Sequence, residues 1–144
     1  MTSENKIKAI LVTRHELMPV QKATLEQIAE IVEVVPQIPT EPQQFQEFVR
    51  QVKAKGAEAI VSVGLPLPII VQLKQAGLRV ILSKQEAIFT GSEEEAKKIQ
   101  AEKPEVRFVL TTKSGEKSMA RVLEFKGWVE IEKVEVVEKP LITV

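Results

Sequence analysis

The sequence contains no cysteine and only one histidine, His15, among its 144 residues. Without cysteine, the chain can form no disulfide, offers no thiol nucleophile and has no thiolate metal site. A single histidine also argues against a structural zinc site, because such a site needs four nitrogen or sulfur ligands. We therefore expect no bound metal ion and no thiol chemistry.

Neither sign of charge is in excess, since 20 basic residues balance 20 acidic ones. This balance argues against a general affinity for duplex DNA, which depends on the release of counterions by many basic side chains. A local basic pocket for a small anionic ligand is compatible with zero net charge, because net charge does not describe patches.

Long hydrophobic runs are also missing. No apolar run approaches the roughly 18 residues that a membrane-spanning helix needs, and residues 1–6 do not form a signal-peptide pattern. We therefore expect a cytoplasmic protein with no membrane partner. The length predicts one domain over residues 1–144, large enough to bury a core.

The first two thirds of the chain alternate between strand-like and helix-like patterns. An apolar run begins at Ile7 and stops at the polar triplet Thr13-Arg14-His15, which is typical of a buried strand followed by a turn. Further strands are expected over residues 31–35, 57–63 and 78–82. Helices are expected over residues 17–30, from the N-cap Thr40 to residue 56, up to residue 76, and from the N-cap Ser92 to residue 104.

The last third is rich in β-strand patterns. Residues 105–112 read as a strand, residues 113–116 as a turn, and residues 121–138 as antiparallel strands with a break near Gly127. The whole pattern predicts an α/β fold with a mainly parallel, three-layer sheet and an antiparallel β-rich hairpin at one edge.

Polar residues cluster where the expected strands end, and ligands of open α/β sheets bind beyond the carboxyl ends of the strands. Hydroxyls, backbone N–H groups and single cations suit a phosphate or nucleotide ligand. A plainer alternative is that Arg14 and His15 are solvated loop residues. The candidates are Thr13, Arg14, His15, Ser62, Gly64, Ser83, Lys84, Thr111, Thr112 and Lys113.

Several familiar site patterns are absent from the sequence. Residues 113–118 contain Lys, Ser and Gly, but they lack the spacing of a P-loop, and β-structure rather than a helix is expected after them. No Gly-x-Gly-x-x-Gly motif occurs, so no dinucleotide cofactor is indicated. The acidic run of residues 93–95 is typical of a solvated helix start and not of a metal site.

The segment His15-Glu16-Leu17-Met18-Pro19-Val20-Gln21 resembles the opening of a group of small CRISPR-accessory proteins, which carry His-x-Leu-Thr-x-x-Gln after the first strand. Residues 60–64, the Thr-Thr-Lys of residues 111–113 and Phe-Lys-Gly-Trp-Val at residues 125–129 are also similar to this group. Met18 stands where the group prefers threonine, and Gly127 stands where it has a hairpin histidine. The group is similar to CARF domains, which are Rossmann-like dimers that bind cyclic oligoadenylates.

The resemblance implies a homodimer that binds a cyclic oligoadenylate, with cyclic tetra-adenylate favoured, and cleaves it as a metal-independent ring nuclease in type III CRISPR antiviral signalling. In such cleavage a ribose 2′-OH attacks the neighbouring phosphate, and the protein fixes the in-line geometry. Arg14 and Lys113 would stabilise charge on the phosphate, and His15 would serve as general acid or base. Gln21, which completes the motif, joins the other candidates as a ligand-binding residue.

Two other functions fit the same sequence. A non-catalytic sensor or sponge would bind the cyclic nucleotide without cutting it. A plain dimeric interaction module would neither bind nor cut the cyclic nucleotide. Phe125 and Trp128 would then be interface anchors or part of the core.

Overall fold

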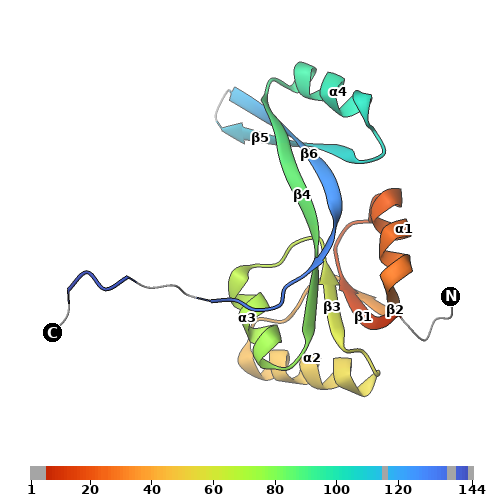
Figure 1. The fold of residues 1–144 in the computed structure, drawn as a ribbon, viewed down its shortest axis with the longest axis vertical. Helices are drawn as coiled ribbons and strands as arrows, with labels where there is room; N and C mark the ends of the chain where they lie inside the picture. Colours follow the sequence, from red (N-terminus) through yellow and green to blue (C-terminus); the bar gives the residue numbers. More distant parts are fainter. Residues whose placement is uncertain (1–5, 115–116, 136–138, 143–144) are drawn as a thin grey trace.

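The computed structural model describes residues 6–114, 117–135 and 139–142. It is an α/β structure with one six-stranded sheet, in the strand order β2-β1-β3-β4-β6-β5 (Figure 1). The strands are β1 (Ile7–Val12), β2 (Ala29–Val35), β3 (Ala59–Ser62), β4 (Arg79–Gly91), β5 (Arg107–Ser114) and β6 (Lys117–Glu130). The helices are α1 (Pro19–Ile28), α2 (Pro42–Ala54), α3 (Leu67–Gln75) and α4 (Glu93–Glu102).

The sheet is mixed and curled, which corrects the expectation of a mainly parallel one. Strands β2, β1, β3 and β4 pair in parallel, whereas β6 pairs antiparallel with both β4 and β5. The two longest strands, β4 and β6, belong to the antiparallel part and extend well beyond the parallel strands (Figure 1). The expected hairpin at one sheet edge is present as β5 and β6.

The molecule therefore has two regions, joined by β4 and β6. We call residues 6–84 and 127–131 the proximal region, and residues 85–125 the distal region. The proximal region contains the parallel strands with α1, α2 and α3, and the distal region contains α4, β5 and the outer parts of β4 and β6 (Figure 1).

Helices cover both faces of the parallel strands in the proximal region. Successive side chains of a strand point to opposite faces, so Ile10 and Val12 join the core beneath α2 and α3, whereas Ala9 and Leu11 join the core beneath α1. Helix α1 begins at Pro19, where the missing N–H costs nothing. The N-cap of α2 is Glu41 and not the predicted Thr40, because the helix begins one residue later, at Pro42.

Strand β4 continues to Gly91, although the sequence predicted its end near residue 82. Ser83 and Lys84 resemble turn residues, but β6 lies alongside and takes up the backbone hydrogen bonds of this stretch. The alternation over residues 121–138 predicted more than one strand. Its described part forms β6 up to Glu130 and no strand over residues 131–135, and residues 136–138 lie outside the described residues.

Strand β6 bends where the two regions meet. Gly127 has a φ of +128°, a backbone conformation that disfavours residues with a Cβ atom. Opposite it, Lys84 pairs with Gly127 and Gln85 pairs with Phe125, so Lys126 is left over as a β-bulge. The predicted break near Gly127 is thus a bend within one strand.

One helix covers the distal region. Ser92 caps α4 as predicted, and its hydroxyl oxygen accepts a hydrogen bond of 3.3 Å from the Glu95 amide. Ala96 of α4 packs against Ala120 and Val122 of β6. None of the helices in the described part of the chain has the length and apolarity that crossing a membrane requires.

Candidate functional site

The carboxyl end of β1 is the point at which the strand order reverses. Strand β1 lies between β2 and β3, so the chain leaves β1 through α1 toward one neighbour and returns through α2 to the other. Ligands of open α/β sheets bind at such a point. The prediction that Thr13, Arg14 and His15 follow a buried strand is confirmed, and this strand is second in the strand order, between β2 and β3.

A crevice of about 530 Å³ opens at this position. Its walls come from the segments that follow β1, β2 and β3, and from the start of α3. We call this cavity the crevice. Its polar lining residues are Thr13, Arg14, His15, Gln37, Thr40 and Ser62.

Two side-chain hydroxyls shape the turns that border the crevice. The Thr13 hydroxyl donates to the His15 carbonyl at 2.7 Å and accepts from the His15 amide at 3.2 Å. One strand further along the sheet, the Ser62 hydroxyl donates to the Gly64 carbonyl at 3.1 Å and accepts from the Gly64 amide at 3.3 Å. Such local bonds are the usual way in which Ser and Thr stabilise turns. Thr13 and Ser62 therefore hold the backbone that presents Arg14, His15 and Gly64.

Arg14 brings a positive charge to the crevice with no carboxylate beside it. Its exposed guanidinium donates a hydrogen bond to the neutral Gln37 side chain from the segment after β2. All ion pairs within 4.0 Å among the described residues lie elsewhere and involve neither Arg14 nor His15. A phosphate could therefore bind Arg14 without displacing a carboxylate.

The start of α3 contributes little to anion binding. The amides of Ile69 and Ile70 both donate to the Pro66 carbonyl, at 3.0 and 3.2 Å, and Pro68 has no N–H. Gly64, by contrast, faces open space, since a Cβ atom there would meet nothing within 4 Å. A ligand can thus approach Gly64 closely, although the Gly64 amide already donates to the Ser62 hydroxyl.

Gln21 and Ser83 are buried and bond to each other rather than lining the crevice. The side-chain oxygen of Gln21 accepts from the Met18 backbone amide at 2.9 Å, and the side-chain nitrogen of Gln21 donates to the Ser83 hydroxyl at 3.2 Å. Ser83 in turn donates to Gln85 at 2.8 Å. This series of hydrogen bonds connects the first turn of α1 to β4. In the described structure, Gln21 and Ser83 therefore position the segment after β1.

Trp128 holds the same helix from β6. Its indole N–H donates to the Gln21 carbonyl and to the Thr24 hydroxyl, both at 3.1 Å. Phe125 is 7% exposed and packs edge-to-face on Trp128, with ring centroids 6.0 Å apart. Both rings thus make their contacts within the chain, in agreement with the interpretation that they belong to the core.

The remaining predicted site residues lie away from the crevice. Lys84 is exposed on β4 and lines neither of the two cavities described here. Thr111, Thr112 and Lys113 lie on β5, where Thr111 is level with Ala120 and Gly91 at the outer end of β4. From Leu82, which is level with Ser62, to Gly91 the strand covers roughly 30 Å at about 3.3 Å per residue. Within one chain, Lys113 therefore lies too far from Arg14 to share a site with it.

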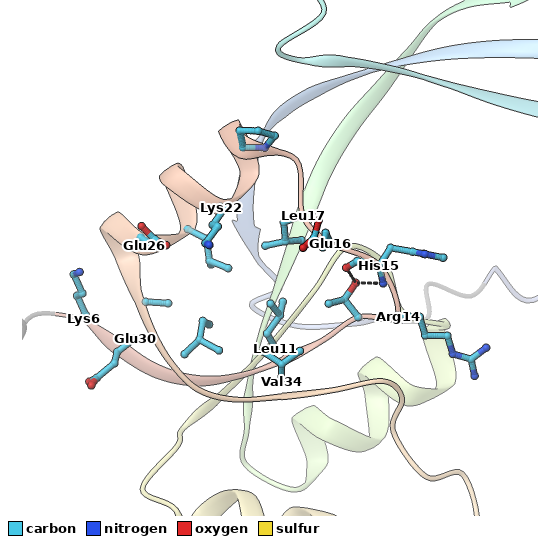
Figure 2. Close-up of a pocket in the computed structure, with 15 residues that line it drawn as sticks. Lys6, Leu11, Arg14, His15, Glu16, Leu17, Lys22, Glu26, Glu30 and Val34 are labelled. Carbon is cyan, nitrogen blue, oxygen red and sulfur yellow. Dashed lines mark hydrogen bonds between the residues drawn. The ribbon is translucent and has the colours of Figure 1, made fainter.

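A second, larger cavity lies on the other side of the same segment. This groove, of about 1010 Å³, runs between α1 and the strands β1 and β2 (Figure 2). Thr13, Arg14 and His15 line both the groove and the crevice. Sequence reasoning missed the other groove residues, because Leu11, Leu17 and Val34 have the pattern of ordinary core positions.

The charge pairs that shift pKa values lie outside both cavities. Hydrogen bonds from Lys126 and then Arg107 lower the pKa of Glu124 in the distal region. A hydrogen bond from Arg79 lowers the pKa of Glu130 at the end of β6. These pairs stabilise strand pairing and do not contribute to the crevice.

The crevice offers a guanidinium and an imidazole, which suit the recognition of an anion, and open space beside Gly64. Within the described residues, no group of three or more histidine and carboxylate side chains could hold a metal ion. Comparisons of the chain with protein-family models, with curated proteins and with solved structures give no match.

Proposed function

We propose that the crevice binds a phosphate group of a nucleotide ligand. The observation that carries this proposal is the charge of Arg14, which forms no ion pair with any described residue and lies beside His15 at the point where the strand order reverses. A charged hydrogen bond from arginine to phosphate is among the stronger polar contacts that a protein offers.

The finer proposal is that the ligand is a cyclic oligoadenylate, with cyclic tetra-adenylate favoured, in CRISPR antiviral signalling. The His15–Gln21 motif supports it, and so does the order β2-β1-β3-β4 of the parallel strands, which fits a Rossmann-like proximal region. The protein would act in the cytoplasm.

Cleavage of that ligand requires no metal ion. The 2′-oxygen of a ribose would form a bond to the adjacent phosphorus while the bond from phosphorus to the 5′-oxygen breaks, which leaves a 2′,3′-cyclic phosphate and a 5′-hydroxyl. Arg14 would stabilise the charge on the phosphate oxygens. The 2′ proton passes to His15 or to water, and His15 or water supplies the proton of the 5′-hydroxyl, because in-line positioning alone can drive the reaction.

A homodimer is part of the proposal. Leu110 and Met119 are 46% and 54% exposed on β5 and β6. They lie on the sheet face opposite α4, since their neighbours Val109 and Ala120 face that helix. A second copy would cover this apolar face, and light scattering at micromolar concentration should give twice the monomer mass.

The decisive test is incubation of the purified protein with cyclic tetra-adenylate in the presence of EDTA. A linear product supports the ring nuclease, and tight binding without product supports the sensor or sponge. A protein that neither binds nor cuts contradicts the proposal and leaves the interaction module. Arg50→Ala is a matched control for Arg14→Ala, because Arg50 is exposed on α2 and lines neither cavity.

A further inference from the structure

The groove beside α1 has an apolar floor that the fold leaves uncovered. Helix α1 places Leu25 over β1 and β3, where Ala9, Leu11, Ala59 and Val61 are buried. It does not reach over the end of β2, so Val34 remains 57% exposed at the floor of the groove. Figure 2 shows Leu11 and Val34 between the helix and the strands.

An irregularity in β2 explains how this floor arises. Ala9 pairs with Ile31, whereas Ile10 pairs with Glu33, so Val32 is skipped as a β-bulge. Beyond the bulge, Val34 pairs with Leu11. The bulge therefore gives Ile31 and Val34 the same face, although an odd number of positions separates them. Without it, strict alternation would turn one of these side chains away from α1.

The charges around the groove differ from those of the crevice. Lys22 and Glu26 lie along α1, and Lys6 and Glu30 lie at the end away from Arg14 (Figure 2). Glu16 also lines the groove, so three glutamates stand against these two lysines, and apart from Arg14 the groove has no excess positive charge for a second phosphate. An apolar floor with positive and negative side chains at its rim is typical of a site for an uncharged organic group.

The groove and the crevice meet at one short segment. Val34 lies beside Leu11, and the Thr13 amide donates to the Val35 carbonyl at 2.9 Å. Arg14 comes three residues after Leu11, so the Cα atoms of these two residues are at most roughly 10 Å apart. A ligand with a phosphate at Arg14 can thus extend past Thr13 and His15 into the groove.

We propose that the groove between α1 and β2 binds the base of the same nucleotide whose phosphate lies at Arg14. This inference rests on the proposed function and adds a second contact to it. The flat face of a purine covers Val34 and Leu11, and the polar edge of the base reaches the charged rim. The site thereby favours a nucleotide over a phosphate that carries no base.

The test compares two probes on two variants of one strand. The probes are adenosine 5′-monophosphate and ribose 5-phosphate, titrated by NMR into the full chain. Val34→Trp fills the groove. Val32→Trp is the matched control, because Val32 is 39% exposed on the same strand and lines neither cavity.

The wild type should bind the nucleotide about tenfold more tightly than the sugar phosphate, since burial of apolar surface between the base and Val34 contributes on this scale. Val34→Trp should remove this preference and leave the affinity for ribose 5-phosphate unchanged, whereas Val32→Trp should behave as the wild type. Val34→Ala, a smaller change that keeps the fold, should lower only the affinity for the nucleotide.

Other outcomes separate the two proposals. A wild type that binds neither probe overturns the proposed function and this inference with it. Binding of both probes with equal affinity, or equal losses in both tryptophan variants, overturns the inference alone. A change of oligomeric state in Val34→Trp with unchanged binding of both probes also overturns it, because the groove would then belong to a contact between copies.

Discussion

The proximal and distal regions share two strands but are stabilised differently. The proximal region has helices on both sheet faces and two buried clusters of twelve and seven residues. The distal region has one helix and a buried cluster of three residues, Ala96, Ala120 and Val122. Charged contacts add to this small core, since Arg107 bonds to Glu124 at 3.0 Å, to Glu102 at 3.1 Å and to the Ile99 carbonyl at 2.7 Å.

The difference indicates where a ligand site can be built. Both cavities lie in the proximal region, where the segment after β1 lies between the ends of β2 and β3 above two buried clusters. Because the distal region has few apolar contacts, we expect it to open locally at a lower free energy than the proximal region.

The largest expected effect comes from the proximal core. Leu73 is fully buried beneath the sheet, and Leu73→Ala should lower the free energy of unfolding by about 3 kcal/mol. Val122→Ala in the distal core should lower it by about 2 kcal/mol and should speed hydrogen exchange in α4 and β5 but not in β1 or β3. Equal acceleration in both regions would show that the two regions unfold as one unit.

A smaller effect separates the crevice from the rest of the sheet edge. Arg14→Ala should weaken ligand binding by about 2 kcal/mol, because it removes a charged phosphate contact. Lys84→Ala should change binding much less, since Lys84 lines neither cavity. Titration of the two variants with cyclic tetra-adenylate decides, and equal or reversed losses would remove Arg14 from the site.

Acid should loosen the distal region. Lys126 and Arg107 lower the pKa of Glu124 in the folded chain, so this carboxylate stabilises the fold above its unfolded pKa of about 4.3. The stabilisation disappears as the pH falls through the lowered folded pKa. The protection of β5 and β6 amides against hydrogen exchange, relative to the intrinsic exchange rate, should therefore fall as the pH drops below about 4.3. Glu124→Gln should abolish most of this dependence, and an unaltered dependence would assign it to other carboxylates.

The smallest effect is expected at His15. The imidazole is exposed, and no carboxylate lies within 4.0 Å of it among the described residues to orient it for proton transfer. If the protein cleaves its ligand, His15→Ala should leave the single-turnover rate at saturating protein within about tenfold of the wild type. A loss of about 100-fold or more with normal binding would assign proton transfer to His15.

The sequence predicted those parts of the fold that depend on local pattern. The apolar run before Thr13, the Ser92 cap and the parallel βα units follow from periodicity and capping, and all are present. The full length of β4 could not be predicted, because it depends on pairing with β6, which is distant in sequence.

The candidate site was predicted only in part, because local pattern places residues at strand ends but does not show which strands pair. Arg14, His15 and Gly64 follow neighbouring strands, so they meet wherever those strands are parallel. Lys113 follows a strand-like pattern too, but its strand pairs only with β6 at the far edge of the sheet. The groove could not be predicted from the sequence. Alternation along β2 does not show that Val32 is skipped in the pairing with β1, which gives Ile31 and Val34 a common face.

The pairing of Gly91 with Ala120 gives the chain a modular tip. These residues close the ladder between β4 and β6, and opposite residues of an antiparallel pair lie about 5 Å apart. A two-residue Asn-Gly turn could span that gap and turn β4 and β6 into a single hairpin. The intervening residues 92–119 carry α4 and β5 and line neither cavity. A chain without this tip should keep the surroundings of the segment that follows β1, and it should lose Leu110 and Met119, through which we propose that two copies meet.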